Sequence, residues 1–402
     1  MASVPAQIDL NSPESLNDQA AYFTAARRNG DVQWSDVHRG WVALSHAEVE
    51  AGLRDNETLS SDRMAVFQRV ATGRSAAFQR VTELLSGWMN FRDPPVHTRL
   101  REPVRTAFTP RAIAGLEADI QSIVDSVIDA LDPNDADLSH DFARPIPALV
   151  IGALLGVDPE DRHRFYSWSH DLGQLVFAIS PGEAPEESVG AATGEFIDFF
   201  SRLIERERKA PRDTLLGAIV RSDSGDLTPM ELVGACTLIL FGGHETTTTL
   251  LVNALGILLQ RPDLLAWLRD HPESDSTAFD EFMRVRGPAR AIPRKTAIDH
   301  VRGGQQLRAG QNMFLCVAAA NHDEAVFERP AEIDLTRTPN PHLGFGWGLH
   351  YCLGSNLARL EARIALRTLF ERFPTISALG EVPGPRASAL GYGRRPLHAR
   401  LK

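Results

Sequence analysis

A lone cysteine lies in the stretch whose residue types most directly suggest chemistry, FGWGLHYCLG at residues 345–354. Three glycines and a histidine accompany Cys352 there, just ahead of an apolar helical run. A structural cysteine needs no glycines around it. A thiolate that binds a large group, in contrast, needs a backbone that passes close to that group and donates N–H groups to sulfur. We therefore interpret Cys352 as a ligand in a glycine-rich loop, with a helix start just behind it that favours the thiolate.

A second polar cluster, GGHETT at residues 242–247, lies within an otherwise apolar segment. This segment predicts one long helix over about 229–260, with a capping box between Thr228 and Glu231 at its start and Pro262 just past its end. Paired glycines weaken a helix. They indicate either a distortion that frees a carbonyl beside an acid and a hydroxyl for proton transfer, or a site of close helix packing. The sequence leaves both interpretations open.

Charge and composition favour small-molecule chemistry. The chain has 402 residues and a formal net charge of −10, which argues against nucleic-acid binding. It has no apolar run of about 18 residues that would span a membrane, and no secretory leader at its start, so we expect a cytoplasmic protein. Cys236, Cys316 and Cys352 are widely spaced without a CxxC pair, which indicates neither a disulfide framework nor a zinc site.

The order of the predicted elements indicates a mainly α protein with small β-sheets. No linker or repeat divides the sequence, so we expect a single domain over residues 1–402. Two short strand patterns predict a β-hairpin at about 30–45, and further short strands are expected near 296–317 and 387–400. Most of the remaining sequence has helical periodicity.

Four motifs follow one another in an order typical of one family: HTRLR at 97–101, GGHETT at 242–247, EFMR at 281–284 and FGWGLHYCLG at 345–354. On these motifs, nearly the whole chain resembles the bacterial cytochrome P-450 enzymes, the heme-thiolate monooxygenases of the soluble, ferredoxin-dependent type. The resemblance implies the family's fold, a single triangular-prism-like domain whose long central helix crosses over a heme b (iron protoporphyrin IX) cofactor.

The resemblance also assigns residues to the heme. Cys352 would be the axial ligand of the iron, in a loop that contacts the porphyrin through Phe345, Gly346 and Gly354. The heme propionates would bind four further side chains, namely His97, Arg101, Arg294 and His350. Pro103 departs from the helical pattern that carries the first two of these, because it removes a backbone hydrogen bond to the Arg99 carbonyl, and we expect a kink there.

The Glu-x-x-Arg motif implies a structural clamp. Glu281 and Arg284 share one helical face, and the family's pattern adds a later arginine, Arg337. A buried carboxylate between two guanidinium groups would hold the cysteine-loop side of the fold in place.

The implied chemistry is insertion of one oxygen atom from O2 into a hydrophobic small molecule, by hydroxylation or epoxidation. Thr246 would hydrogen-bond dioxygen and Glu245 would relay protons. Electrons would come from NAD(P)H through a ferredoxin and its reductase to a monomeric enzyme that binds neither nucleic acid nor membrane. Arg105, Arg359 and Arg363 would form either a basic docking face for an acidic ferredoxin or an ordinary solvated helix face.

The expected substrate pocket is apolar and combines segments before the HTRLR motif, on the long helix and near the chain end. Its candidate residues are Phe78, Leu84, Trp88, Val176, Leu238, Phe241, Gly242, Ala291, Ile292 and Tyr392. These residues do not identify the substrate class. The alternatives are a peroxide-using or non-oxygenating enzyme of the same fold and a heme-binding sensor without turnover. The Glu245–Thr246 pair argues against the first alternative, because enzymes that skip dioxygen activation have less need of it.

Overall fold

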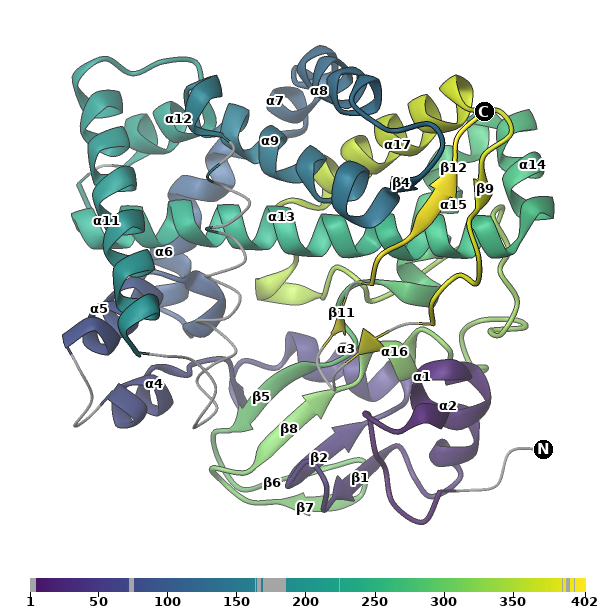
Figure 1. Ribbon diagram of the computed structural model, residues 1–402. Coiled ribbons are helices and arrows are strands. Elements are labelled where there is room, and N and C mark those ends of the chain that lie inside the picture. The colour runs from purple at the N-terminus through teal and green to yellow at the C-terminus, as the bar shows by residue number, and fades with distance from the viewer. Residues whose placement is uncertain are drawn as a thin grey trace.

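A single 32-residue helix, α13 (Pro229–Gln260), crosses the molecule from side to side in the computed structural model (Figure 1). Its capping box is present: the Thr228 hydroxyl accepts a hydrogen bond from the Glu231 N–H at 3.2 Å, and the Glu231 carboxylate accepts one from the Thr228 N–H at 2.9 Å. The helix therefore begins and ends where its sequence predicts. The structure describes residues 5–71, 76–162, 164, 168, 186–223, 225–384, 386–387, 391–393 and 395–402.

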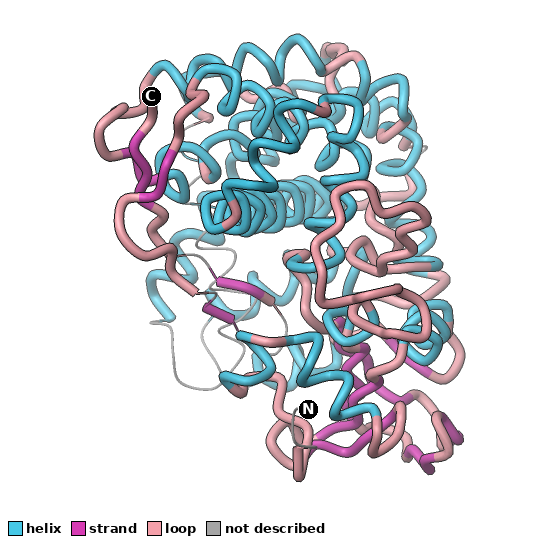
Figure 2. Tube along the Cα trace, turned by 90° about the vertical axis from the view of Figure 1, so that its right-hand side faces the viewer, coloured by secondary structure: helices cyan, strands magenta, loops and turns pink. Residues whose placement is uncertain are grey.

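The other helices surround α13, which is seen nearly end-on among them in Figure 2. They confirm the predicted mainly helical class. In chain order they are α1 (Pro13–Asn17), α2 (Gln19–Arg27), α3 (His46–Arg54), α4 (Met64–Ala71), α5 (Ala76–Ser86), α6 (Val96–Ala107), α7 (Pro110–Ala114), α8 (Glu117–Asp129), α9 (Pro145–Leu154), α11 (Glu186–Lys209), α12 (Leu215–Ser222), α14 (Pro262–Asp270), α15 (Asp275–Arg286), α16 (Val317–Ala320) and α17 (Ser355–Arg372).

A five-stranded sheet lies below α13 in both views, with α1 and α2 beside it in Figure 1 (Figures 1 and 2). Its strand order is β1 (Val32–Ser35), β2 (Gly40–Ala43), β8 (Asn312–Leu315), β5 (Ile292–Thr296) and β3 (Leu59–Ser60). The first two strands form the predicted hairpin, and β2 pairs with β8 in parallel while the other pairs are antiparallel.

Three smaller sheets complete the β structure among the described residues. They comprise β6 (His300–Arg302) with β7 (Gln305–Leu307), β10 (Arg386–Ala387) with β11 (Tyr392–Gly393), and β4 (Ala136–Asp137), β12 (His398–Arg400) and β9 (Ser377–Ala378). The strands predicted near 296–317 and 387–400 fall within these sheets and the larger one.

Helix α6 connects the start of α13 to the cavity described below. Arg99 on α6 donates two hydrogen bonds to the Glu231 carboxylate of α13, at 2.9 and 2.6 Å. The helix continues through Pro103 without a break, so the proline does not end it, and the kink predicted there stays a prediction. Among the described residues, no helix is both long and apolar enough to cross a membrane.

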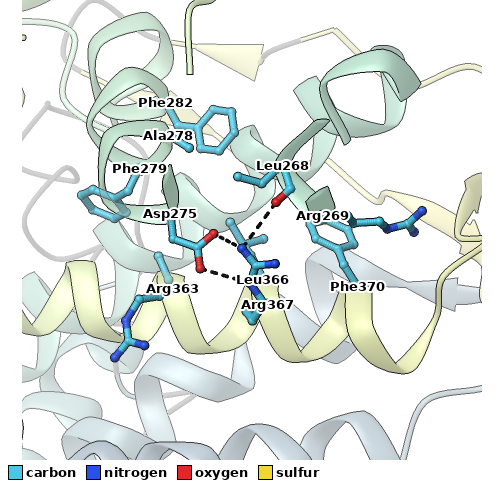
Figure 3. Close-up of a pocket in the computed structure, with 11 residues that line it drawn as sticks. Leu268, Arg269, Asp275, Ala278, Phe279, Phe282, Arg363, Leu366, Arg367 and Phe370 are labelled. Atoms are coloured by element: carbon cyan, nitrogen blue, oxygen red, sulfur yellow. Dashed lines mark hydrogen bonds and ion pairs between the residues drawn. The ribbon is translucent and has the colours of Figure 1, made fainter. Parts of the chain in front are cut away.

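A small pocket of about 20 Å³ lies where α17 meets α14 and α15 (Figure 3). Arg367 from α17 reaches across it to the Asp275 carboxylate, with one nitrogen–oxygen distance of 3.1 Å, and toward the Leu268 carbonyl. This volume holds about one water molecule. The contact therefore fixes α17, the helix behind the cysteine loop, and forms no ligand site.

Candidate active site

A cavity of about 450 Å³ lies between α13 and the cysteine loop. Its walls include Leu238, Gly242 and Thr246 from the helix, and Cys352 and Gly354 from the loop. This size falls within the range of small-molecule and cofactor pockets. Segments far apart in the sequence thus meet around one enclosed space.

The cysteine loop bends tightly at two glycines. Gly346 and Gly348 have φ angles of +69° and +67°, where a side chain is strained, and a Cβ on Gly348 would lie 3.1 Å from the Leu53 carbonyl. The Cys352 N–H donates to the Phe345 carbonyl at 3.0 Å and closes the loop. A Cβ on Gly354 would meet nothing within 4 Å. The loop therefore needs its first two glycines for conformation, while Gly354 leaves open space.

The Cys352 thiol is accessible from the cavity and is otherwise enclosed by protein. Burial raises the pKa of this thiol, whereas the Gly354 N–H and the charges of Arg101 and Arg359 lower it. Helix α17 begins three residues later and adds its positive amino-terminal end. These groups favour a thiolate that is coordinated to a cation in the cavity.

The other two cysteines have no such setting. Cys236 and Cys316 are buried in apolar surroundings, and burial raises their pKa values to about 12 and about 11. Both are inert core residues.

The paired glycines Gly242 and Gly243 of α13 have different surroundings. A Cβ on Gly243 would lie 2.5 Å from Ile151 of α9, so this glycine permits close helix packing. A Cβ on Gly242 would meet nothing within 4 Å, and Gly242 lines the cavity. The helix is continuous here, and the distortion predicted at the paired glycines stays a prediction. Both glycines line the cavity, and the missing side chain of Gly242 leaves room there.

Thr246 faces the cavity from α13. Its hydroxyl donates to the Gly242 carbonyl one turn earlier, which leaves the oxygen lone pairs available to accept a hydrogen bond. The Glu245 carboxylate is half-buried and lies 3.7 Å from Nδ1 of His244, outside the cavity wall. His244 itself is buried and bonds the Arg144 carbonyl at 3.0 Å. The predicted catalytic pair is therefore split, with only Thr246 at the wall.

Two imidazoles lie side by side next to the cavity: partly buried His350 lines it, and His97 is fully buried beside His350. The ring centroids of His97 and His350 are 4.2 Å apart. Both ring nitrogens of His97 and Nε2 of His350 are buried without a hydrogen-bond partner. Burial lowers the pKa of His97 to about 4 and that of His350 to about 3. Orphaned buried nitrogens of this kind indicate that a polar group belongs beside them.

Two guanidinium groups stand near these imidazoles. Arg101 donates to the Tyr351 carbonyl, and Arg294 donates to the Pro293 carbonyl at 3.1 Å. Burial lowers the pKa of both, that of Arg294 to about 10. Within the described part of the chain, neither forms an ion pair with a carboxylate. Three of the four predicted propionate ligands, Arg101, Arg294 and His350, therefore line the cavity, and His97 lies buried against His350.

The predicted clamp lies behind the cysteine loop. Arg284 grips the Glu281 carboxylate with two hydrogen bonds of 2.8 and 2.7 Å, and Arg337 adds one of 3.1 Å. The Asn321 carbonyl accepts from Arg284 at 2.9 Å, and the Asn321 side chain accepts from the Leu343 N–H at 2.8 Å. The clamp is thus connected to the segment that enters the cysteine loop.

The structure separates the residues predicted for the substrate pocket. Leu238, Gly242 and Ile292 line the cavity. Four others lie in the core: Leu84, Ala291, Trp88, whose indole N–H donates to Thr237 at 3.0 Å, and Phe241, which packs on Trp88. Val176 and the side chains of Phe78 and Tyr392 lie outside the described residues. Sequence reasoning missed several wall residues, namely Ser61, Arg63, Met89, Asn90, Phe91, Ile151, Ile239 and Ala289.

The three arginines considered for docking are each paired within the chain. Arg105 binds Glu102, Arg359 binds Asp280 at 2.9 Å, and Arg363 binds Glu117 at 2.7 Å. These pairs reduce the positive charge that this face presents.

Comparison with known proteins gives a consistent result. A family model described as cytochrome P-450 matches residues 276–398. The chain is 32% identical over 381 residues to the cytochrome P-450 CYP107DY1 of Priestia megaterium, with 92% of each chain covered. It is 37% identical over 369 residues to the mycinamicin IV hydroxylase/epoxidase of Micromonospora griseorubida, with 88% of this chain and 89% of that one covered.

A solved structure agrees with the fold. The myxobacterial cytochrome P-450 CYP267B1 in complex with myristic acid superimposes with a TM-score of 0.84 at 32% identity, covering 97% of this chain and 98% of that chain. The chain belongs to the cytochrome P-450 family. It is a P-450 monooxygenase, which binds heme, uses O2 and takes electrons derived from NAD(P)H.

The residues present fit a heme. The cavity offers the Cys352 thiol on one side, and His350, Arg101 and Arg294 at its edge, with unpartnered ring nitrogens on His350 and on the adjacent His97. A porphyrin with one axial thiolate and two propionates would use these groups in one placement.

Proposed function

We propose that this protein inserts one oxygen atom from O2 into a C–H or C=C bond of a hydrophobic small molecule, as a hydroxylase or an epoxidase. Cys352 would hold the heme iron, and His97, Arg101, Arg294 and His350 would hold the propionates. Heme with an axial thiolate supplies the O–O bond cleavage. The observation that carries the proposal is the Cys352 thiol in one cavity with Gly242 and Thr246 of α13.

Thr246 would handle a proton on the α13 side of the cavity. Its hydroxyl can accept a hydrogen bond from a water molecule. Once the hydroxyl stops donating to the Gly242 carbonyl, it can donate a hydrogen bond to the reacting oxygen. Glu245 would deliver protons from the half-buried position next to it, after turning away from His244. Gly242 would leave room for oxygen and water.

A hydrophobic substrate is supported by the apolar residues of the cavity wall. Leu238, Ile239, Phe91 and Ile292 present apolar surface there. One relative is named as a mycinamicin IV hydroxylase/epoxidase, and one solved neighbour is in complex with myristic acid, which is consistent with an organic small molecule as the substrate.

We further propose that the electrons arrive through a ferredoxin and its reductase. The support is the family's use of separate electron carriers and the position of the cysteine loop, where Trp347 and Tyr351 are 39% and 36% exposed. Because Arg105, Arg359 and Arg363 are paired internally, the attraction for an acidic ferredoxin would be moderate and sensitive to salt.

A two-stage experiment tests this function. The ferric protein is titrated with apolar compounds, and those that shift the iron spin state are incubated with ferredoxin, reductase, NAD(P)H and isotopically labelled O2. A product that carries one labelled oxygen atom supports the proposal. Turnover with peroxide alone would favour the peroxide-using alternative, and ligand binding without NAD(P)H consumption would favour a sensor.

A further inference from the structure

Two buried guanidinium groups lie on the same side of the cavity, and only one of them was expected there. Arg63, just before α4, lines the cavity together with Arg294. Within the part of the chain that the structure describes, no carboxylate forms an ion pair with either side chain. Arg63 instead lies over the Phe91 ring, with its guanidinium carbon 5.5 Å from the ring centroid. Burial lowers the pKa of both arginines, and the Arg63 charge lowers that of Arg294 further.

The sheet register brings these groups together. Strands β3 and β5 are antiparallel, with Leu59 opposite Thr296 and Ser60 opposite Lys295, so Ser61 follows in the direction of Arg294. Ser61 is 4% exposed, and its hydroxyl lines the cavity without a hydrogen-bond partner. A buried hydroxyl and two buried cations therefore face one region of the cavity.

The nearby acid, Asp93, offsets only part of this charge, because it raises the pKa of Arg294 less than burial and the Arg63 charge lower it. Asp93 accepts hydrogen bonds from the Ser60 hydroxyl and, at 2.8 Å, from the Ser61 N–H. Both of its oxygens are thus used to fasten the end of β3 to the segment before α6. Two like charges that are desolvated together are costly unless an anion lies between them.

We propose that Arg63 and Ser61, together with Arg294, bind one carboxylate in the cavity, and that this carboxylate is a heme propionate. The proposal rests on the proposed function, which places a propionate at Arg294. It adds two propionate-binding residues to the four predicted from the sequence. The Arg63 guanidinium would form two hydrogen bonds to the propionate carboxylate, and the Ser61 hydroxyl would donate a third. These hydrogen bonds would stabilise the negative charge of the propionate.

Heme transfer from the holoenzyme to excess apomyoglobin tests this proposal. Arg63→Gln should release heme about tenfold faster than the unmodified protein, and Ser61→Ala about fivefold faster. Arg69→Gln is the matched control, because Arg69 is exposed on α4 and the substitution makes the same change in charge. It should leave the rate unchanged. Holoenzyme reconstituted with heme dimethyl ester, which lacks carboxylates, should show no difference between Arg63→Gln and the unmodified protein.

Each other outcome overturns the proposal in a distinguishable way. If Arg294→Gln accelerates heme loss and Arg63→Gln does not, only the role of Arg63 fails. If neither does, the propionate placement in the proposed function fails as well.

Equal acceleration of heme loss by Arg63→Gln with heme and with its dimethyl ester would mean that Arg63 only supports the fold. If Arg63→Gln leaves heme loss unchanged but weakens the binding of myristic acid more than that of its methyl ester, Arg63 binds a substrate carboxylate. Ser61→Ala keeps the test valid if Arg63→Gln fails to fold.

Discussion

The imidazole rings of His97 and His350 lie 4.2 Å apart, and three of their four ring nitrogens are buried without a partner. The first ring belongs to α6 and the second to the cysteine loop, so this contact joins two motifs that are far apart in the sequence. Burial keeps both rings neutral at pH 7, because it lowers both pKa values. The unpartnered nitrogens of this pair therefore lower the free energy of unfolding of the protein without heme, and they are available to bind a carboxylate.

Replacing His97 should affect the apoprotein and the holoenzyme in opposite directions. His97→Leu removes two orphaned polar atoms at similar volume, so the apoprotein should gain about 1 kcal/mol in its free energy of unfolding. The holoenzyme should lose heme faster, because a propionate donor is gone. Urea unfolding and heme transfer measure the two effects. A loss of stability in the apoprotein would mean that His97 is already well paired without heme.

The Glu281 clamp should dominate the stability of the cysteine-loop side. Glu281→Ala leaves Arg284 and Arg337 without their carboxylate, and Arg284 is 1% exposed. We expect a loss of about 3–5 kcal/mol in denaturant unfolding, accompanied by weaker heme retention. The control is Glu332→Ala, which breaks an exposed pair with Arg329 and should cost less than about 1 kcal/mol. Equal losses for the two variants would contradict a buried clamp.

Glu231 should make stability depend on pH in the acid range. Its hydrogen bonds from Arg99 are the main reason that its pKa falls to about 2, from an ordinary value of 4.5. A depressed carboxyl pKa stabilises the folded state above the ordinary pKa, and that contribution disappears as the pH falls toward the folded-state value. Glu231→Gln should therefore be less stable than the unmodified protein at pH 7, and the difference should shrink between pH 4.5 and 2.

The exposed pair of Glu102 and Arg105 provides the comparison for this pH effect. Glu102→Gln should change little at any pH, because solvent screens an exposed pair. A Glu231→Gln difference that stays constant down to pH 2 would show that the helix cap, and not the charge, accounts for the loss.

Thr246 should control how efficiently electrons reach product. Thr246→Ala should keep heme and substrate binding but divert most of the NAD(P)H consumed to hydrogen peroxide. Of the two threonines of the described GGHETT segment that line the cavity, Thr246 is exposed, whereas Thr247 is 4% exposed. Thr248→Ala is the control: its buried hydroxyl bonds the His244 carbonyl at 2.8 Å. Product formed per NAD(P)H and peroxide are measured together. Unchanged coupling in Thr246→Ala would remove it from the mechanism.

The sequence predicts those features that depend on local signals. The capping box at Thr228 and Glu231 predicts the start of α13, and the glycines around Cys352 predict a tight loop. Family motifs predict the clamp and the four donors at the cavity. These signals lie within a few residues of the groups they position.

Features that depend on the packing of distant segments could not be predicted in the same way. Trp88 and Phe241 are apolar residues in the expected segments, yet they pack on each other: Trp88, just after α5, is buried in the core, and Phe241 of α13 packs against that core. The sequence around Arg63 does not distinguish it from a surface arginine. Its position beside Arg294 at the cavity follows from the register of β3 and β5. The split of Glu245 from Thr246 likewise depends on the rotation of α13 about its axis.

The carbon monoxide difference spectrum of the dithionite-reduced protein shows whether Cys352 holds the heme iron. We expect a strongly red-shifted Soret band, the mark of thiolate ligation, both in the unmodified protein and in Cys236→Ser, which replaces a buried thiol of α13. Cys352→Ser should abolish that band. A band at the shorter wavelength of histidine ligation in the unmodified protein, or a red-shifted band that survives Cys352→Ser, would contradict this expectation.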